Sequence, residues 1–117
     1  SNRSPWLMYI QPGEVYTCPI SHGEGRFIAS DELVARLASN GQIATQYCDN
    51  DGRPTMDLRF NPNGSVDAIE GITSPDGRVF GKMGHSERVG YRYPLYVNVD
   101  GQYDNRMFKA AVDYFTK

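Results

Sequence analysis

The chain has few of the features that mark nucleic-acid-binding or membrane proteins. Its 117 residues carry a formal net charge of −2, and its 12 basic side chains form no cluster. This balance argues against a nucleic-acid partner, which requires concentrated positive charge. The longest apolar run is far shorter than the roughly 20 residues that a membrane-spanning helix needs, and no signal-peptide pattern is present. We therefore expect neither a nucleic-acid nor a membrane role.

Cysteine and histidine are also scarce. Cys18 and Cys48 are the only cysteines, and His22 and His85 the only histidines. Two cysteines in a chain of this size are typical of reduced residues in a cytoplasmic protein and not of a disulfide framework. Any chemistry that needs an imidazole must therefore use one of two residues.

Glycine and proline, by contrast, are plentiful, with twelve and seven residues. They predict short elements joined by many turns. The length fits one domain, which can bury roughly two-thirds of its unfolded surface. The pattern predicts an α/β or α+β order of two strands, a helix, four strands and a final helix.

Local signals place all of these elements except one of the four strands that follow the first helix. Two short strands are predicted on either side of Pro12-Gly13, a helix in ASDELVARLASNG with Ser30 or Asp31 as its cap, a strand in QIATQYC, a hairpin with strands at 68–73 and 78–83 around SPDG, and a closing helix in NRMFKAAVDYF. The first helix has Leu33, Val34 and Leu37 on its apolar face, and the second has Met107, Phe108, Ala111, Val112 and Phe115.

His85 and Glu87 lie just beyond the second hairpin strand, in GHSER. In an extended segment, residues i and i+2 point to the same side and their Cα atoms are about 6.5 Å apart. The carboxylate can then accept a hydrogen bond from the imidazole and orient it as a general base. On spacing alone, a surface pair without a function is the preferred interpretation, because His-x-Glu occurs by chance on many protein surfaces.

Two other interpretations use the same or neighbouring residues. His22 and Glu24 repeat the His-x-Glu spacing in SHGEGRF, so a metal-dependent hydrolase could combine them with His85 and Glu87. No helical His-x-x-x-His spacing supports that site. The Gly-rich loop and the tyrosines of YRYPLY could instead form a non-enzymatic module that binds a small ligand.

A catalytic base also needs a nucleophile to activate. Cys18 lies within the apolar run VYTCPI, and Cys48 ends a strand before an acidic turn. Reactive thiols need electropositive, partly exposed surroundings, which neither pattern offers. Both cysteines are therefore predicted to be packing residues, and the nucleophile is not found within the sequence.

Three phrases taken together resemble one family. PISHGEGRF, the stretch from NPNGS to GKMGHSER, and DNRMFKAAVDYF are similar, in this order and spacing, to the C-terminal half of the glutamine amidotransferase domain of phosphoribosylformylglycinamidine synthase. The resemblance covers roughly residues 15 to 117. It implies a class I, triad-type glutaminase with a flavodoxin-like α/β fold, so a mixed sheet with two main helices is expected.

The resemblance also assigns roles to residues. His85 and Glu87 match the base and its orienting carboxylate in a Cys-His-Glu triad, and Ser21, His22 and Gly23 match the loop that lines the glutamine pocket. Gly84 and Ser86 replace the prolines that usually flank the histidine, which predicts a less rigid loop. The cysteine-bearing Gly-x-Cys-x-Gly segment has no counterpart in these residues.

From the resemblance we expect residues 1–117 to be a single partial domain, inactive alone, that uses glutamine and no metal or cofactor of its own. ATP and magnesium would belong to the synthetase domain of the parent ligase. The expected partners are the rest of the glutaminase domain and that synthetase domain. An uncovered sheet edge or apolar face would also favour self-association.

Overall fold

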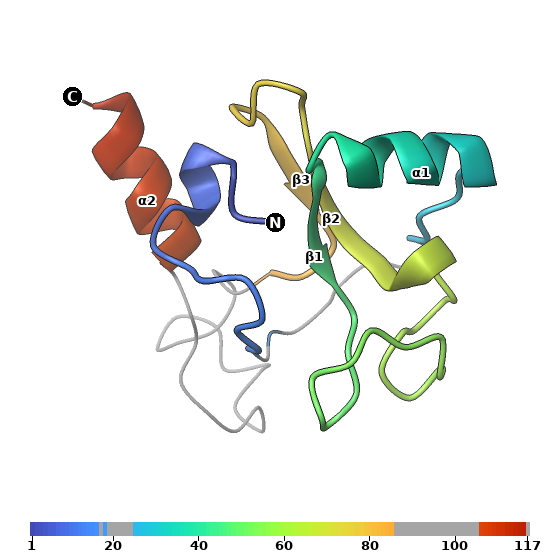
Figure 1. Cartoon of the computed structure of the whole chain (residues 1–117). Coiled ribbons are helices and arrows are strands. Elements are labelled where there is room, and N and C mark those ends of the chain that lie inside the picture. Colours follow the sequence, from blue (N-terminus) through green and yellow to red (C-terminus); the bar gives the residue numbers. More distant parts are fainter. Residues whose placement is uncertain (17, 19–24, 86–105, 117) are drawn as a thin grey trace.

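A computed structural model describes residues 1–16, 18, 25–85 and 106–116 as a small α/β structure. In chain order it contains the 3-10 helix η1 (Pro5–Leu7), helix α1 (Asp31–Ser39), strand β1 (Ile43–Gln46), the 3-10 helix η2 (Val66–Ala68), strand β2 (Ile69–Thr73), strand β3 (Phe80–Lys82) and helix α2 (Arg106–Phe115). Figure 1 shows the sheet between α1 on one side and the pair of η1 and α2 on the other.

The sheet has the strand order β1-β2-β3, and both pairings are antiparallel. In the β2–β3 pairing, Gly71 lies opposite Lys82. The mixed sheet expected from the resemblance is therefore wrong for the described residues. A short turn joins β2 to β3, and strands connected in this way must run antiparallel. The flavodoxin-like architecture remains an expectation.

The hairpin of β2 and β3 confirms the sequence prediction, although its second strand begins later than expected. Its turn closes with a hydrogen bond of 2.9 Å from the Ser74 N–H to the Val79 carbonyl. Gly77 has a φ of +76°, and a Cβ at this position would come within 2.9 Å of Ser4 Cα. Both the backbone conformation and the close approach of Ser4 therefore require glycine.

Helix α1 and strand β1 were also predicted. Ser30 is the helix cap, and its hydroxyl accepts a hydrogen bond of 3.2 Å from the Leu33 N–H. Val34 and Leu37 are buried, but Leu33 is 40% exposed, so the apolar face is narrower than the pattern indicated. Strand β1 covers only the middle of the predicted QIATQYC segment.

Helix α2 forms where expected and is amphipathic. Met107, Ala110 and Ala111 are buried on its inner side. Phe108, Val112 and Phe115, which the pattern placed on the apolar face, are 38%, 60% and 50% exposed. Much of the predicted apolar face of α2 is therefore uncovered in the described structure.

The first predicted strand is wrong, because residues 5–7 form η1 instead. Ser4 caps this turn by accepting a hydrogen bond from the Trp6 N–H, and Pro5 occupies the first helical position, where its fixed φ is favourable. The Ser4 hydroxyl also donates to the Gly77 carbonyl at 2.6 Å, and Trp6 Nε1 donates to the Arg78 carbonyl at 2.9 Å. These tertiary contacts override the strand pattern. The described part of the second predicted strand, 14–16 and 18, is not a strand either.

The hydrophobic core lies between the N-terminal segment and α2. Leu7, Ile10 and Met107 form its buried centre, and Trp6 and Phe80 pack against it. The Trp6 ring lies 6.3 Å from that of Phe80, and the partly exposed rings of Phe108 and Phe115 are also 6.4 Å away. The N-terminal segment therefore packs against both β3 and α2.

The NPNGS segment forms a turn, as its composition predicts, and the side chains at its two ends, Asn61 and Ser65, are fully buried. The amide nitrogen of Asn61 donates to the carbonyls of Thr55 and Ser65, both at 3.1 Å. Ser65 in turn accepts a hydrogen bond of 3.0 Å from the Phe27 N–H. The turn thus fixes Phe27 close to the start of β2.

Neither described helix is long and apolar enough to cross a membrane.

Candidate active site at the end of β3

His85 lies three residues after the end of β3, where the chain leaves the sheet. It lines a cavity of about 310 Å³ together with Trp6, Phe80, Gly81, Lys82, Gly84, Met107 and Phe108. The walls come from η1, β3 and α2, so three separate parts of the chain meet beside the imidazole. A half-buried base on a largely apolar wall suits proton transfer, since such a site limits competition from water.

The two residues that precede His85 contact a buried carboxylate from the neighbouring strand. Glu70, in β2, accepts hydrogen bonds at Oε1 from the N–H groups of Met83 at 3.1 Å and Gly84 at 2.5 Å. Its other carboxylate oxygen accepts a hydrogen bond from the Thr45 hydroxyl. Only 8% of the Glu70 side chain is exposed, so these contacts are well shielded from water.

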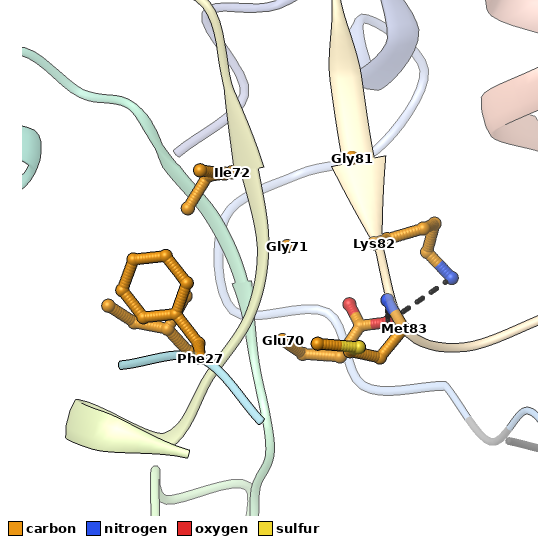
Figure 2. A pocket seen from close by; sticks show the side chains of 8 residues that line it. Phe27, Glu70, Gly71, Ile72, Gly81, Lys82 and Met83 are labelled. Atoms are coloured by element: carbon orange, nitrogen blue, oxygen red, sulfur yellow. Dashed lines mark hydrogen bonds and ion pairs between the residues drawn. The ribbon is translucent and has the colours of Figure 1, made fainter. Parts of the chain in front are cut away.

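Lys82 provides the opposite charge. Its ammonium lies 3.5 Å from Glu70 Oε1 and donates a hydrogen bond of 2.9 Å to the Gly84 carbonyl. Figure 2 shows the two charged groups pointing toward one another beside Met83. Lys82 is also 5.6 Å from the centre of the Tyr16 ring, close enough for a cation–π contact.

A second, smaller cavity of about 160 Å³ lies against the hairpin (Figure 2). Phe27, Met83 and residues from both β2 and β3 line it, and Glu70 is its acidic residue. Lys82 lines both cavities, so the ion pair that it forms with Glu70 within the hairpin borders both of them.

Sequence reasoning missed Glu70 and Lys82. In a half-exposed strand, a charged residue is normally assigned to the solvent face. Strand β2, however, has four of its five residues buried, so both of its faces are covered. The available signal was the pairing of opposite charges on adjacent hairpin strands, which are close enough to interact across the ladder.

Cys18 lies against the same segment. A Cβ added to Gly84 would be 2.2 Å from the Cys18 sulfur, so only glycine fits there without a rearrangement. Nearby, burial, helped by the charges of Glu70 and Cys18, raises the pKa of Tyr47 to about 12. The buried Tyr47 hydroxyl has no hydrogen-bond partner within the described part of the chain.

Cys48 follows strand β1 and forms an isolated bridge with Pro54. Both cysteines are half-buried and neither forms a disulfide, which agrees with the predicted packing role. Burial raises the pKa of the Cys48 thiol, and the neighbouring Asp49 carboxylate raises it further. These surroundings oppose formation of the thiolate, the form that acts as a nucleophile.

The other predicted site residues lie outside the described residues. These are Glu87, the expected partner of His85, and Ser21, His22 and Gly23 of the predicted glutamine loop. The alternative metal site also used Glu24, so His85 is its single described member. Within the described ranges, no three His, Cys, Asp or Glu side chains gather in a way that could bind a metal ion.

Residues 1–115 match the family of CobB/CobQ-like glutamine amidotransferase domains. The chain belongs to this family. Together with the curated relatives, this match confirms the resemblance to the glutamine amidotransferase domain of phosphoribosylformylglycinamidine synthase at the level of the sequence.

Three of these relatives carry the name phosphoribosylformylglycinamidine synthase subunit PurQ. The protein from Thermomicrobium roseum is 44% identical over 78% of this chain and 38% of its own length. Those from Gloeobacter violaceus and Methanocaldococcus jannaschii are 41% and 37% identical, over 92% and 97% of this chain and 44% and 46% of their own lengths. The chain therefore spans less than half the length of these relatives.

Proposed function

We propose that the chain carries the base half of a glutaminase site, which releases ammonia for the amidination of formylglycinamide ribonucleotide by phosphoribosylformylglycinamidine synthase. The main structural support is the position of His85 at the end of β3, on the wall of the 310 Å³ cavity. The family membership and the relatives named as PurQ subunits support the substrate and the pathway.

In the proposed reaction, a cysteine thiol outside these 117 residues is the nucleophile. His85 takes the thiol proton as the thiolate attacks the side-chain amide carbon of glutamine. The imidazolium then gives a proton to the departing ammonia, which leaves a thioester. Water hydrolyses the thioester to glutamate, with His85 again acting as base and the thiol as leaving group.

Glu87 and the glutamine loop complete the proposal. The Glu87 carboxylate would accept a hydrogen bond from His85 and fix its tautomer, and Ser21, His22 and Gly23 would contact glutamine. ATP and magnesium would be used by the synthetase, without a metal or cofactor in this chain. The remainder of the glutaminase and the synthetase are the proposed partners.

Two features support further parts of the proposal. A chain with only two cysteines, Cys18 and Cys48, is typical of a reducing compartment, so we place the protein in the cytoplasm. The exposed apolar side chains of α2, Val112 and Phe115 among them, offer a surface for the remaining glutaminase residues or for self-association.

The test is His85→Ala in the complete protein that carries this chain, assayed with glutamine and with free ammonia. Loss of the base should lower glutamine-dependent turnover by about 10²- to 10⁴-fold, because general-base catalysis contributes a factor of this size. Ammonia-dependent turnover should be unchanged, since it bypasses the glutaminase site.

The other histidine provides a matched control. His22→Ala should mainly raise the KM for glutamine, because His22 is assigned to binding and not to proton transfer. Equal loss of both activities in His85→Ala would contradict the role given to His85.

A further inference from the structure

The ion pair of Glu70 and Lys82 has no assigned role in the proposed reaction. Its side chains are only 8% and 13% exposed. A buried ion pair is a weak source of stability, because removing two charges from water offsets most of their attraction, and an apolar pair of similar volume is often as stable. The function of this pair must therefore be sought in what it contacts.

Both charged groups contact the backbone of one residue, Gly84. The Glu70 carboxylate accepts the Gly84 N–H at 2.5 Å, and the Lys82 ammonium donates to the Gly84 carbonyl at 2.9 Å. These are charge-assisted hydrogen bonds in a shielded place, which are stronger than those between neutral groups. They fix both peptide groups of Gly84, including the one that joins it to His85.

The carboxylate itself is fixed from two sides. The Thr45 hydroxyl donates to one oxygen, while Met83 donates its backbone N–H both to the other oxygen at 3.1 Å and to the Glu70 carbonyl at 3.2 Å. Contacts with β1 and with the residue that follows β3 thus fix the direction of the Glu70 side chain. The Gly84 contacts are consequently set by the sheet and not by a mobile side chain.

Gly84 needs such external restraint. Glycine loses more conformational freedom on folding than any other residue, and here it directly precedes the proposed base. A larger residue, which would restrict the backbone by itself, is excluded because its Cβ would meet the Cys18 sulfur. The direction in which His85 enters the cavity therefore depends on the contacts to the Gly84 backbone.

We propose that Glu70 and Lys82 are positioning residues for His85, which fix the Gly84 backbone and so orient the imidazole toward the nucleophile and glutamine. This inference rests on the proposed function, because it assigns the pair to the same proton-transfer step. Catalytic geometry is sensitive to small displacements, and a shift of about 1 Å can lower the rate by roughly 100-fold.

The test compares two double variants in the complete protein. Glu70→Ala/Lys82→Met removes both charges together, so neither ion remains buried alone, and it deletes both contacts to Gly84. Glu70→Gln/Lys82→Met keeps a side-chain oxygen that can accept the Gly84 N–H. The control is Glu32→Ala/Arg36→Met, which removes an exposed pair on α1 whose side chains are 85% and 64% exposed.

We expect Glu70→Ala/Lys82→Met to lower glutamine-dependent kcat by about 10- to 100-fold, with little change in KM. Glu70→Gln/Lys82→Met should recover part of this loss, and the α1 control should show none. Ammonia-dependent turnover should be unchanged in all three, because it bypasses the glutaminase site, and chemical denaturation checks that each variant folds.

Wild-type glutamine-dependent kcat in Glu70→Ala/Lys82→Met would overturn the inference. If that variant does not fold, Glu70→Gln/Lys82→Met is compared with wild type instead. This variant lacks the contact from Lys82 to Gly84, so an unchanged kcat would also overturn the inference. Failure of the proposed function gives a different result, namely glutamine-dependent turnover that survives His85→Ala.

Discussion

His85 and Cys48 each follow a strand of the same sheet, but their surroundings differ. Beside His85 there is a cavity of about 310 Å³, and the preceding residue contacts two buried charges through its backbone. Cys48 takes part in a single bridge with Pro54, and burial and Asp49 raise the pKa of its thiol. The surroundings of His85 hold the backbone beside the imidazole in a fixed position, whereas those of Cys48 favour the protonated thiol. The difference agrees with the proposal that Cys48 is not the nucleophile of the site that includes His85.

Of the substitutions that test this comparison, Glu70→Ala alone should have the largest effect on the free energy of unfolding. It leaves Lys82 buried without its counter-charge and two backbone N–H groups without their acceptor, so the free energy of unfolding should fall by about 3–5 kcal/mol. Chemical denaturation of the complete protein measures this change. Adding Lys82→Met should restore most of the loss, because the isolated charge is removed.

Glu32→Ala on α1 is the matched control, since Glu32 forms an exposed ion pair with Arg36. Its effect should be at most about 1 kcal/mol. A Glu70→Ala variant as stable as this control would show that the Glu70 contacts are not formed, and the contrast between the two strand ends would lose its physical basis.

A smaller effect is expected beside Cys48, from Tyr47→Phe. The Tyr47 hydroxyl is buried without a hydrogen-bond partner in the described part of the chain, so its removal should leave stability unchanged or raise it by up to about 1 kcal/mol. Tyr9→Phe is the control, because the Tyr9 hydroxyl donates to Asp113 at 2.6 Å and its loss should be unfavourable. A larger loss for Tyr47→Phe than for Tyr9→Phe would contradict this assignment.

The raised pKa of Tyr47 also predicts that the stability of the wild-type chain depends on pH. The folded chain raises the pKa of Tyr47 to about 12, against roughly 10 for an unperturbed tyrosine. The folded state therefore favours the neutral phenol, and this contribution to stability is fully present below pH 10. It is lost as the pH rises from about 10 toward 12, where the unfolded chain ionises first. Tyr47→Phe should remove that alkaline loss.

Local signals in the sequence were sufficient for elements that depend on local chemistry. The cap at Ser30 predicted α1, and Asp-Gly predicted the β2–β3 turn. Local signals failed where contacts between residues far apart in the sequence determine the secondary structure. The apolar run at Trp6 resembles a strand, but hydrogen bonds from Ser4 and Trp6 to the hairpin turn favour η1.

The same limit applied to the candidate site. The pattern found His85, since there are only two histidines and the surrounding phrases resemble a family. It did not find Glu70, because a charged residue in a strand indicates exposure unless both faces of the sheet are known to be covered. Its contact with Gly84 depends on the pairing of β2 and β3, and this is visible only in the folded chain.

The central claim, that this chain supplies the base while the nucleophile lies elsewhere, is tested most directly by covalent labelling. A glutamine analogue with a diazoketone in place of the side-chain amide loses N₂ and forms a thioether with the attacking cysteine. In the complete protein, mass spectrometry should place the label on a cysteine other than Cys18 and Cys48, and His85→Ala should slow the labelling strongly. Label on Cys18 or Cys48, or an unchanged labelling rate in His85→Ala, would contradict the account.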